Sequence, residues 1–359
     1  MGVKVSFLLP SLGDKPGGGY KIVLEYANRL TKKGIIVDVV YPLCVKNRGL
    51  IMNIIGTLYR LLRFIFRRYS SNSWFNLSKN VKEKIVWRLS DRYLPKSDLY
   101  IATAVGTAMD LNQCNIPKNK ELYFIQGYED WSCSVKVLEA TYNYGMTNIV
   151  VSNWLKELLS QKGVKSYLVR NAFDFEYFTL TKPVAERDKL HISLLYSENP
   201  IKGTQYALEA LKKLKNEYPE IKVSMFGIYN KPIDLESWIT YYKQPNQETH
   251  NFIYNTSSIF IAPSINEGWG LTVGEAMICG NAVVCTSNKG HFEMATDMKT
   301  ALLCPIKDSQ AIYDRVKILI ENDALRYSIA NNGLNNIKKY TWEKSVDALY
   351  EIIIKHSRL

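Results

Sequence analysis

Strand-like and helix-like segments alternate along both halves of this 359-residue chain, and no other feature constrains its fold as strongly. Residues 3–9 form a short apolar run, and three glycines follow at 17–19. Residues 20–33 then carry apolar side chains at helical spacing, and residues 35–41 read as a second strand. A strand, a helix and a strand in this order form a right-handed parallel unit, so the sequence predicts a parallel sheet.

The second half of the chain repeats this order, and its length fits two domains of roughly 150 residues each. We therefore predict an α/β fold of two Rossmann-like, doubly wound parallel-sheet domains that face each other across a cleft. The predicted strands are 99–103, 122–126, 148–152, 191–197, 222–227, 258–263 and 282–287, and the later predicted helices are 204–216, 271–279, 308–322, 324–338 and 342–356.

The stretch 263–277 carries the most chemistry, because it follows a predicted strand and opens a predicted helix. A helix start has unpaired backbone N–H groups that suit phosphate oxygens, and here they belong to Gly270, Leu271 and Thr272. Glu267 precedes the helix and Glu275 lies about one turn inside it. Carboxylates accept hydrogen bonds from sugar or ribose hydroxyls. The alternative is a plain helix start whose two glutamates complement the helix dipole.

This stretch resembles the E-x7-E signature of the retaining GT-B glycosyltransferases, specifically glycosyltransferase family 4, the glycosyl transferases group 1. Glu267 and Glu275 stand at the spacing of that signature. The resemblance implies that Glu267 lies beside the donor sugar as a catalytic residue and that Glu275 binds the ribose. It also implies a nucleotide diphosphate sugar as donor, retention of the anomeric configuration and no cofactor. The sequence has no Asp-x-Asp pair, so we expect no metal.

Three further elements resemble the same family. Lys202, before Gly203, stands where the family has its diphosphate-binding lysine, which gives it a catalytic role. Gly18 and Gly19 match the N-terminal glycine-rich loop that contacts the donor. Residues 170–174 match the hinge between the domains. We accordingly place an N-terminal acceptor domain at 1–172, to which a C-terminal helix at 340–359 crosses back, and a nucleotide-sugar-binding domain at 173–339.

Two departures from the family pattern stand out. Ser197 occupies the place of a second cation for the diphosphate, so either Lys289 or Arg170 supplies that charge or the serine and backbone donors suffice. Residues 126–131 replace a histidine that many members have near the donor sugar. The four histidines all lie in the second half, so histidine acid chemistry from the first half is excluded.

The formal charge of +12 is concentrated in one segment. Residues 46–96 hold twelve Lys and Arg against Glu83 and Asp91, which gives 12 − 2 = +10. Within it, residues 49–69 have helical apolar spacing with Arg60 and Arg63 near the middle, too charged for a membrane span. The segment is predicted to be an interfacial helix on an anionic membrane, and the alternative is a helix packed on its own domain.

The expected protein is thus a peripheral glycosyltransferase at the cytoplasmic face of the inner membrane, acting on a lipid-linked or cell-surface glycan precursor. Its six scattered cysteines fit a reducing compartment. No nucleic-acid-reading motif is visible, so nucleic acid is not an expected partner. Two other classes stay open: a non-catalytic membrane-binding protein, and a nicotinamide-dependent Rossmann oxidoreductase. The latter is disfavoured because the first loop lacks the G-x-G-x-x-G pattern.

Overall fold

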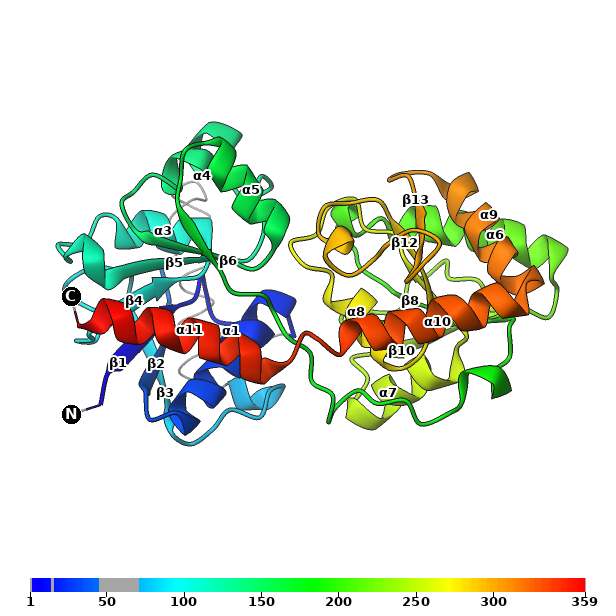
Figure 1. Cartoon of the computed structure of the whole chain (residues 1–359), viewed down its shortest axis with the longest axis horizontal. Helices are drawn as coiled ribbons and strands as arrows, with labels where there is room; N and C mark the ends of the chain where they lie inside the picture. The colour runs from blue at the N-terminus through cyan, green and yellow to red at the C-terminus, as the bar shows by residue number, and fades with distance from the viewer. Residues whose placement is uncertain (1, 14–15, 45–70, 359) are drawn as a thin grey trace. The chain divides into compact units, whose positions relative to one another are not determined.

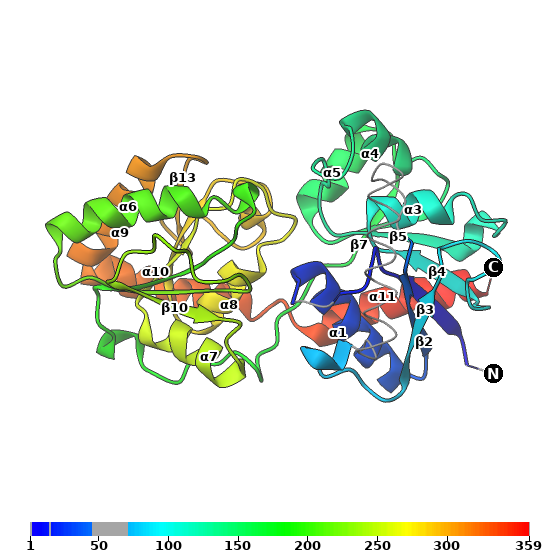
Figure 2. The same cartoon turned by 180° about the vertical axis from the view of Figure 1, so that it is seen from behind.

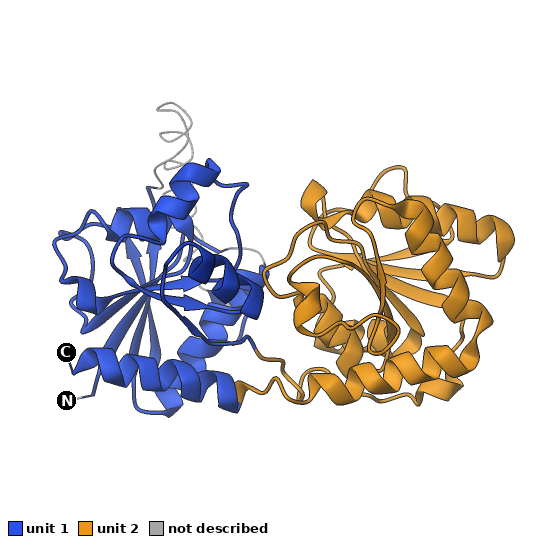
Figure 3. Cartoon of the chain, turned by 45° about the horizontal axis from the view of Figure 1, so that its top comes forward, with its two compact units in different colours: residues 1–171, 343–359 blue, residues 172–342 orange. Residues whose placement is uncertain are grey.

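The structure is a computed structural model that describes residues 2–13, 16–44 and 71–358. The chain divides into two compact units (Figure 3). Unit 1 comprises residues 1–171 and 343–359, and unit 2 comprises residues 172–342. The helix predicted at 49–69 lies outside the described residues.

Unit 1 contains a parallel sheet in the order β3-β2-β1-β4-β5-β6-β7. Helices α1 and α11 lie side by side on one face, and Lys33 at the end of α1 pairs with Asp347 of α11 at 2.5 Å (Figure 1). Helices α3, α4 and α5 lie on the other face, as the rear view also shows (Figure 2). The strands are β1 Lys4–Leu8, β2 Ile36–Pro42, β3 Val81–Val86, β4 Leu99–Ala102, β5 Glu121–Ile125, β6 Thr147–Val150 and β7 Ser166–Leu168. The helices are α1 Gly18–Lys32, α3 Val105–Leu111, α4 Val135–Thr141, α5 Asn153–Gln161 and α11 Trp342–Ser357.

Unit 2 contains a second parallel sheet, in the order β10-β9-β8-β11-β12-β13. Helices α6 and α9 pack together on one face of the sheet, and α8 and α10 pack together on the other (Figure 1). The strands are β8 His191–Leu195, β9 Lys222–Gly227, β10 Ile239–Lys243, β11 Ile259–Ala262, β12 Ala282–Thr286 and β13 Leu302–Cys304. The helices are α6 Thr204–Glu217, α7 Gln247–Thr256, α8 Leu271–Ile278, α9 Ser309–Glu321 and α10 Asp323–Ile337.

Side chains that point alternately to the two faces of the central strands form the core of unit 2. Ile259 and Ile261 of β11 are buried in the cluster that includes Leu211 of α6 and Val316 of α9. Phe260 points to the opposite face, where its ring meets Tyr254. Since successive side chains of a strand point to opposite faces, a strand covered on both sides needs a continuous apolar run. The predicted α/β fold with two doubly wound parallel sheets is confirmed.

The chain passes between the units twice, and the two crossing segments pair with each other inside unit 2. The Phe173 N–H donates to the Tyr340 carbonyl at 3.1 Å, next to a bridge between Phe173 and Thr341. The rings of Phe173, Trp269 and Tyr340 form one cluster, with Trp269 and Tyr340 centroids 5.1 Å apart. A Cβ on Gly274 would lie 2.1 Å from the Phe173 ring. The crossing segments are therefore packed directly against helix α8.

Candidate active site

Both sheets reverse their strand order at one point, and in unit 2 this point lies between β8 and β11. In open parallel sheets, ligands bind outside the carboxyl ends of the strands at such a switch point. The loop after β8 holds Ser197 and Lys202, and the loop after β11 holds Glu267 and leads into α8. The topology thus brings together the residues that the sequence singled out in the second half.

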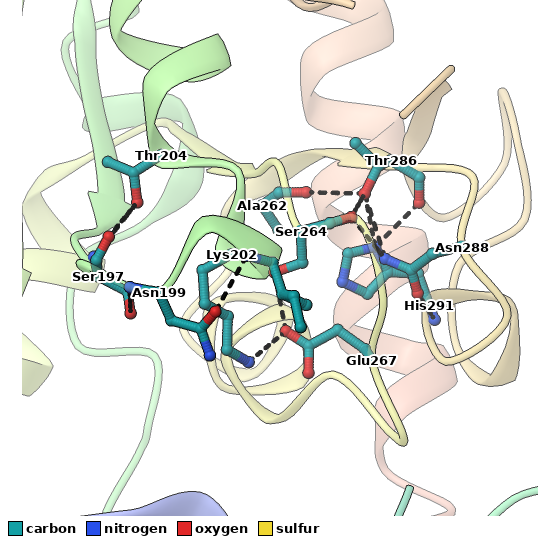
Figure 4. A network of polar contacts seen from close by, with 11 residues as sticks. Ser197, Asn199, Lys202, Thr204, Ala262, Ser264, Glu267, Thr286, Asn288 and His291 are labelled. Atoms are coloured by element: carbon teal, nitrogen blue, oxygen red, sulfur yellow. Dashed lines mark hydrogen bonds and ion pairs between the residues drawn. The ribbon is translucent and has the colours of Figure 1, made fainter. Parts of the chain in front are cut away.

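Lys202 and Glu267 form the centre of this site (Figure 4). The Lys202 Nζ lies 2.7 Å from Glu267 Oε1, and the Ser264 hydroxyl donates to the same oxygen at 2.8 Å. The two side chains are 33% and 15% exposed, so the pair is half-buried but open to a ligand. Burial alone would raise the pKa of the Glu267 carboxyl, but Lys202, His291 and the hydrogen bonds from Lys202 and Ser264 lower it below its ordinary value. Glu267 is therefore ionised at neutral pH.

Backbone contacts lock the two loops against each other. Lys202 ends a short 3-10 turn, Pro200–Lys202, in which the Ile201 N–H donates to the Asn199 side chain at 3.1 Å. Gly203 follows with φ of 64°, and a Cβ there would lie 2.1 Å from the Pro263 carbonyl oxygen. The Ile265 N–H donates to the Ile201 carbonyl at 2.7 Å. Only glycine allows this approach, so Gly203 fixes the position of Lys202 relative to the β11 loop.

Helix α8 begins at the site, and its N-cap residue provides no side-chain hydrogen bond to the backbone donors. Its N-cap is Gly270, at φ of 89°, and its first two residues are Leu271 and Thr272. A helix start of this kind attracts anions through its unpaired N–H groups and its dipole. The geometry suits the phosphate role predicted for these three residues, which stays a prediction.

Glu275 lies within α8 and is 7% exposed. The Tyr254 hydroxyl donates to Glu275 Oε2 at 3.3 Å. Its neighbour Tyr177 has a pKa raised to about 12, by burial first and then by the charges of Glu275 and Asp174. Glu275 is thus a largely buried side chain on the helix that begins with Leu271 and Thr272. Its ribose-binding role stays a prediction.

Ser197 forms hydrogen bonds within its own loop and to the first residue of α6. Its Oγ accepts the Asn199 N–H at 3.2 Å, and its backbone N–H donates to Thr204 Oγ1 at 3.2 Å (Figure 4). These bonds shape the turn that carries Lys202. Of the two substitutes considered for the second cation, Lys289 lies exposed in unit 2 after β12. Arg170 lies in unit 1, where it donates to the Asn153 side chain at 3.1 Å.

The glycine-rich loop of the first half belongs to unit 1 alone. Gly18 and Gly19 are the first residues of α1, with Gly17 as an N-cap that has no side-chain bond. A Cβ on Gly19 would lie 3.5 Å from the Gln126 amide, so the start of α1 sits beside the loop after β5. That loop also holds Glu129, which accepts the Val105 N–H at 3.2 Å. Burial raises the pKa of Glu129 to about 7, with this hydrogen bond opposing the rise.

The sequence analysis did not predict a polar network that is connected to Glu267 through Ser264. The Ser264 carbonyl accepts from the Asn288 amide at 2.9 Å and also from the Thr286 hydroxyl. Asn288 and Thr286 both contact the buried His291 ring (Figure 4). The only signal in the sequence is a run of polar residues directly after the strand 282–287. Among the residues that the structure describes, no three His, Cys, Asp or Glu side chains gather as a metal site.

Comparisons with known proteins identify the domain that contains this site. Residues 184–336 match the family of glycosyl transferases group 1. The matched stretch lies entirely within unit 2. Its relatives include sucrose-phosphate synthase 4 from Arabidopsis thaliana, 34% identical over 30% of this chain and 11% of that protein. O-antigen chain mannosyltransferase B from Escherichia coli is 32% identical over 30% of this chain and 28% of that protein. The chain thus spans less than a third of either relative.

Solved structures extend the likeness from this domain to the whole chain. Sucrose-phosphate synthase from Thermosynechococcus elongatus superposes with a TM-score of 0.75, at 14% identity over 98% of both chains. The Anabaena protein HepE, solved in complex with UDP and glucose, superposes with a TM-score of 0.71, at 15% identity over 99% of this chain and 100% of that one. At such identities the likeness establishes the fold, which is the GT-B fold that the sequence predicted.

Proposed function

We propose that this protein is a glycosyltransferase that moves a sugar from a nucleotide diphosphate sugar to an acceptor. The observation that carries the proposal is the joint placement of Lys202, Glu267 and the uncapped start of α8 at the switch point of unit 2. A cation and free N–H donors are what a diphosphate needs, and an ionised carboxylate beside them accepts sugar hydroxyls. The match of residues 184–336 to the glycosyl transferases group 1 supports the same reading.

In the proposed mechanism, unit 2 stabilises the leaving nucleoside diphosphate by electrostatics. Lys202 and the N–H groups around Gly270, Leu271 and Thr272 face the charge that develops on the diphosphate. Glu267 holds the donor sugar, and Glu275 binds the ribose hydroxyls. We further propose that the reaction retains the anomeric configuration and that it needs neither a metal nor a cofactor, since the protein itself supplies the cation.

For the acceptor we propose a lipid-linked or cell-surface glycan precursor, held by unit 1 at the cytoplasmic face of the inner membrane. The described part of the charged segment 46–96, which belongs to unit 1, adds support of its own. Trp87 is 45% exposed, and around it along the chain Lys82, Lys84 and Arg88 are exposed as well. Exposed tryptophan and basic side chains suit an anionic lipid surface. In the ranges that the structure describes, no helix is long and apolar enough to cross a membrane.

A transfer assay with radiolabelled nucleotide sugars tests the proposed activity. A thermal-shift panel first selects the donor, since a ligand at 100 times its dissociation constant stabilises the protein by about 2.7 kcal/mol. Wild type should then release nucleoside diphosphate, and Glu267→Gln should be severely impaired. Glu248→Gln, an exposed glutamate on α7, is the matched control and should behave as wild type.

The same experiment separates the two other classes. A non-catalytic membrane-binding protein would bind anionic vesicles and turn over no nucleotide sugar. A nicotinamide oxidoreductase would show stabilisation by NAD or NADP and none by nucleotide sugars. Either pattern would refute the proposed function.

A further inference from the structure

His291 is a buried histidine next to the candidate donor site that has no role in the mechanism so far. It begins the 3-10 turn His291–Glu293 after β12 and is 1% exposed. Its Nδ1 lies 2.9 Å from the Thr286 carbonyl oxygen. A carbonyl only accepts hydrogen bonds, so Nδ1 carries a proton and donates it there. The remaining nitrogen, Nε2, is therefore the atom that titrates.

The Asn288 side chain is consistent with this tautomer. Its Oδ1 accepts the His291 N–H at 3.0 Å, which fixes the orientation of the amide. Its Nδ2 then donates to the Ser264 carbonyl at 2.9 Å and to Thr286 Oγ1 at 3.2 Å. Both amide hydrogens are thus used, and the 3.0 Å approach of Nδ2 to His291 Nδ1 needs no hydrogen from the amide.

The free side of the imidazole faces the start of α8. A Cβ on Gly270 would lie 2.9 Å from His291 Cδ2 and 3.6 Å from Nε2. Nε2 makes no hydrogen bond with any residue in the described part of the chain. An unpartnered nitrogen of a buried ring thus lies against the very turn whose backbone donors suit a phosphate.

Burial keeps the His291 ring neutral, and the charges around it have opposing effects on its pKa. Burial lowers the pKa of His291, the nearby Glu267 raises it and Lys202 lowers it further. Glu267 and Lys202 face the ring from the loops after β11 and β8, and Lys289 and Glu293 lie on its own segment. The net direction is downward from the ordinary value of 6.5, so the ring is uncharged at neutral pH.

We propose that His291 is a proton-linked positioning residue for the donor: it takes up one proton from solvent at Nε2 when a diphosphate occupies the start of α8. This inference rests on the proposed function. The diphosphate brings negative charge next to a buried imidazole, which favours the imidazolium form. The protonated ring then supplies, from beneath the Gly270 turn, the second positive charge that Ser197 does not carry. Lys202 supplies the first.

Histidine NMR measures the proton uptake directly. The chain has four histidines, at 191, 250, 291 and 356, and the His291→Gln variant assigns the signal of interest. The probes are UDP-glucose, ADP-glucose and GDP-mannose, whose diphosphates are diesters without a titrating proton near neutral pH. With a bound probe, the pKa of His291 should rise by on the order of one unit, a tenfold gain in proton affinity. The shift is measured on wild-type protein, so it does not depend on any variant folding.

The pH dependence of affinity gives a second readout. If binding takes up a proton, wild type binds the probe more tightly as pH falls from about 8 to about 6, because protons then drive the bound form. His291→Gln keeps a donor for the Thr286 carbonyl but cannot titrate, so its affinity should be about tenfold weaker at pH 6 and nearly flat with pH. His191→Gln, a partly buried histidine on β8, is the matched control and should keep the wild-type slope.

The outcomes separate the inference from the proposed function. A probe that binds with no change in the His291 pKa and with equal pH slopes in wild type and His291→Gln overturns the proton uptake and leaves the donor site standing. If none of the three probes binds, both the proposed donor class and the role of His291 fail together.

Discussion

Lys202 and Glu267 form an ion pair at 2.7 Å, although each is assigned to a different part of the proposed donor. The ammonium has three donors and the carboxylate has two acceptor oxygens, so the pair can open toward a ligand without leaving either charge unpaired. A diphosphate would compete with Glu267 for Lys202, and the sugar hydroxyls would compensate the carboxylate. The ion pair therefore holds both groups in place before the donor arrives.

Replacement of Lys202 tests its charge. Lys202→Ala removes a cation from the developing diphosphate and should lower kcat on the order of 10²–10³-fold, as loss of one transition-state donor does. Lys202→Arg keeps the charge in another shape and should lose less. Steady-state turnover of the selected donor measures both. Lys212→Ala, a surface lysine on α6 paired with Glu236, is the control. Equal rates for the arginine and alanine variants would remove Lys202 from the mechanism.

Substitution of Glu275 tests the proposed ribose contact separately from the transfer reaction. Glu275→Ala should weaken nucleoside diphosphate binding by about 1–3 kcal/mol, because hydroxyls lose a charged acceptor. Titration calorimetry with the nucleoside diphosphate measures this, with Glu248→Ala as the exposed control. The loss should appear equally for the nucleoside monophosphate, which shares the ribose. An unchanged affinity would contradict the assignment.

At the scale of elements, the sequence predicted strands that contain an apolar run and missed strands in which charged or polar side chains interrupt it. The strands at 99–103, 122–126 and 148–152 are confirmed as β4, β5 and β6. In contrast, β3 has the sequence VKEKIV and lies at the edge of its sheet, where its two lysine side chains are exposed to solvent. Helix α7 is polar and short, and it gives no clear period. Edge and surface elements are stabilised by neighbours, which single-sequence patterns do not contain.

The candidate site also contains residues that the sequence predicted and residues that it did not. Glu267 and Glu275 were predicted from the spacing of a family signature and Lys202 from its place before Gly203, and the structure brings Lys202 and Glu267 together. His291 was not found, since a single histidine after a strand looks like any other until its ring is seen against Gly270. Contacts between loops after different strands depend on the strand order, and local sequence does not encode them.

Helix α8 yields a prediction about packing at Gly274. Alanine normally stabilises a helix interior by about 1 kcal/mol relative to glycine. Here its Cβ would strike the Phe173 ring, which Trp269 and Tyr340 hold in place, so Gly274→Ala should instead destabilise unit 2 by about 1–3 kcal/mol. The midpoint of urea unfolding measures the change. Gly106→Ala, in α3 with no atom within 4 Å of the new Cβ, is the control and should be neutral or stabilising.

A second substitution shows whether Phe173 causes the effect. Phe173→Leu shortens the side chain, so in the double variant the alanine should regain part of its loss, with a coupling energy of about 0.5–3 kcal/mol. Simple additivity of the two changes would show that the clash lies elsewhere.

For the whole molecule, the uneven charge predicts where the protein works. Replacing Arg60, Arg63, Arg67 and Arg68 by Gln should release it from anionic vesicles, since each basic residue near the surface contributes about 1 kcal/mol. Hydrolysis of the nucleotide sugar in solution should persist, because the proposed donor site belongs to unit 2. Co-sedimentation with vesicles at low and high salt measures the binding, which should fade as the Debye length shortens. Wild type that stays in the supernatant at low salt would refute the membrane role.

The paired crossing segments have a consequence for the ancestry of such chains. Because Phe173 and Thr341 are bridged, the entry to unit 2 and its exit are neighbours in space. A genetic recombination event with two breakpoints at these positions would exchange the whole of unit 2, the proposed donor domain, and rejoin a continuous backbone. Chimeras built at the same two points should therefore inherit the sugar of one parent and the acceptor of the other. Swapping whole halves in this way would diversify glycans faster than changing residues one at a time.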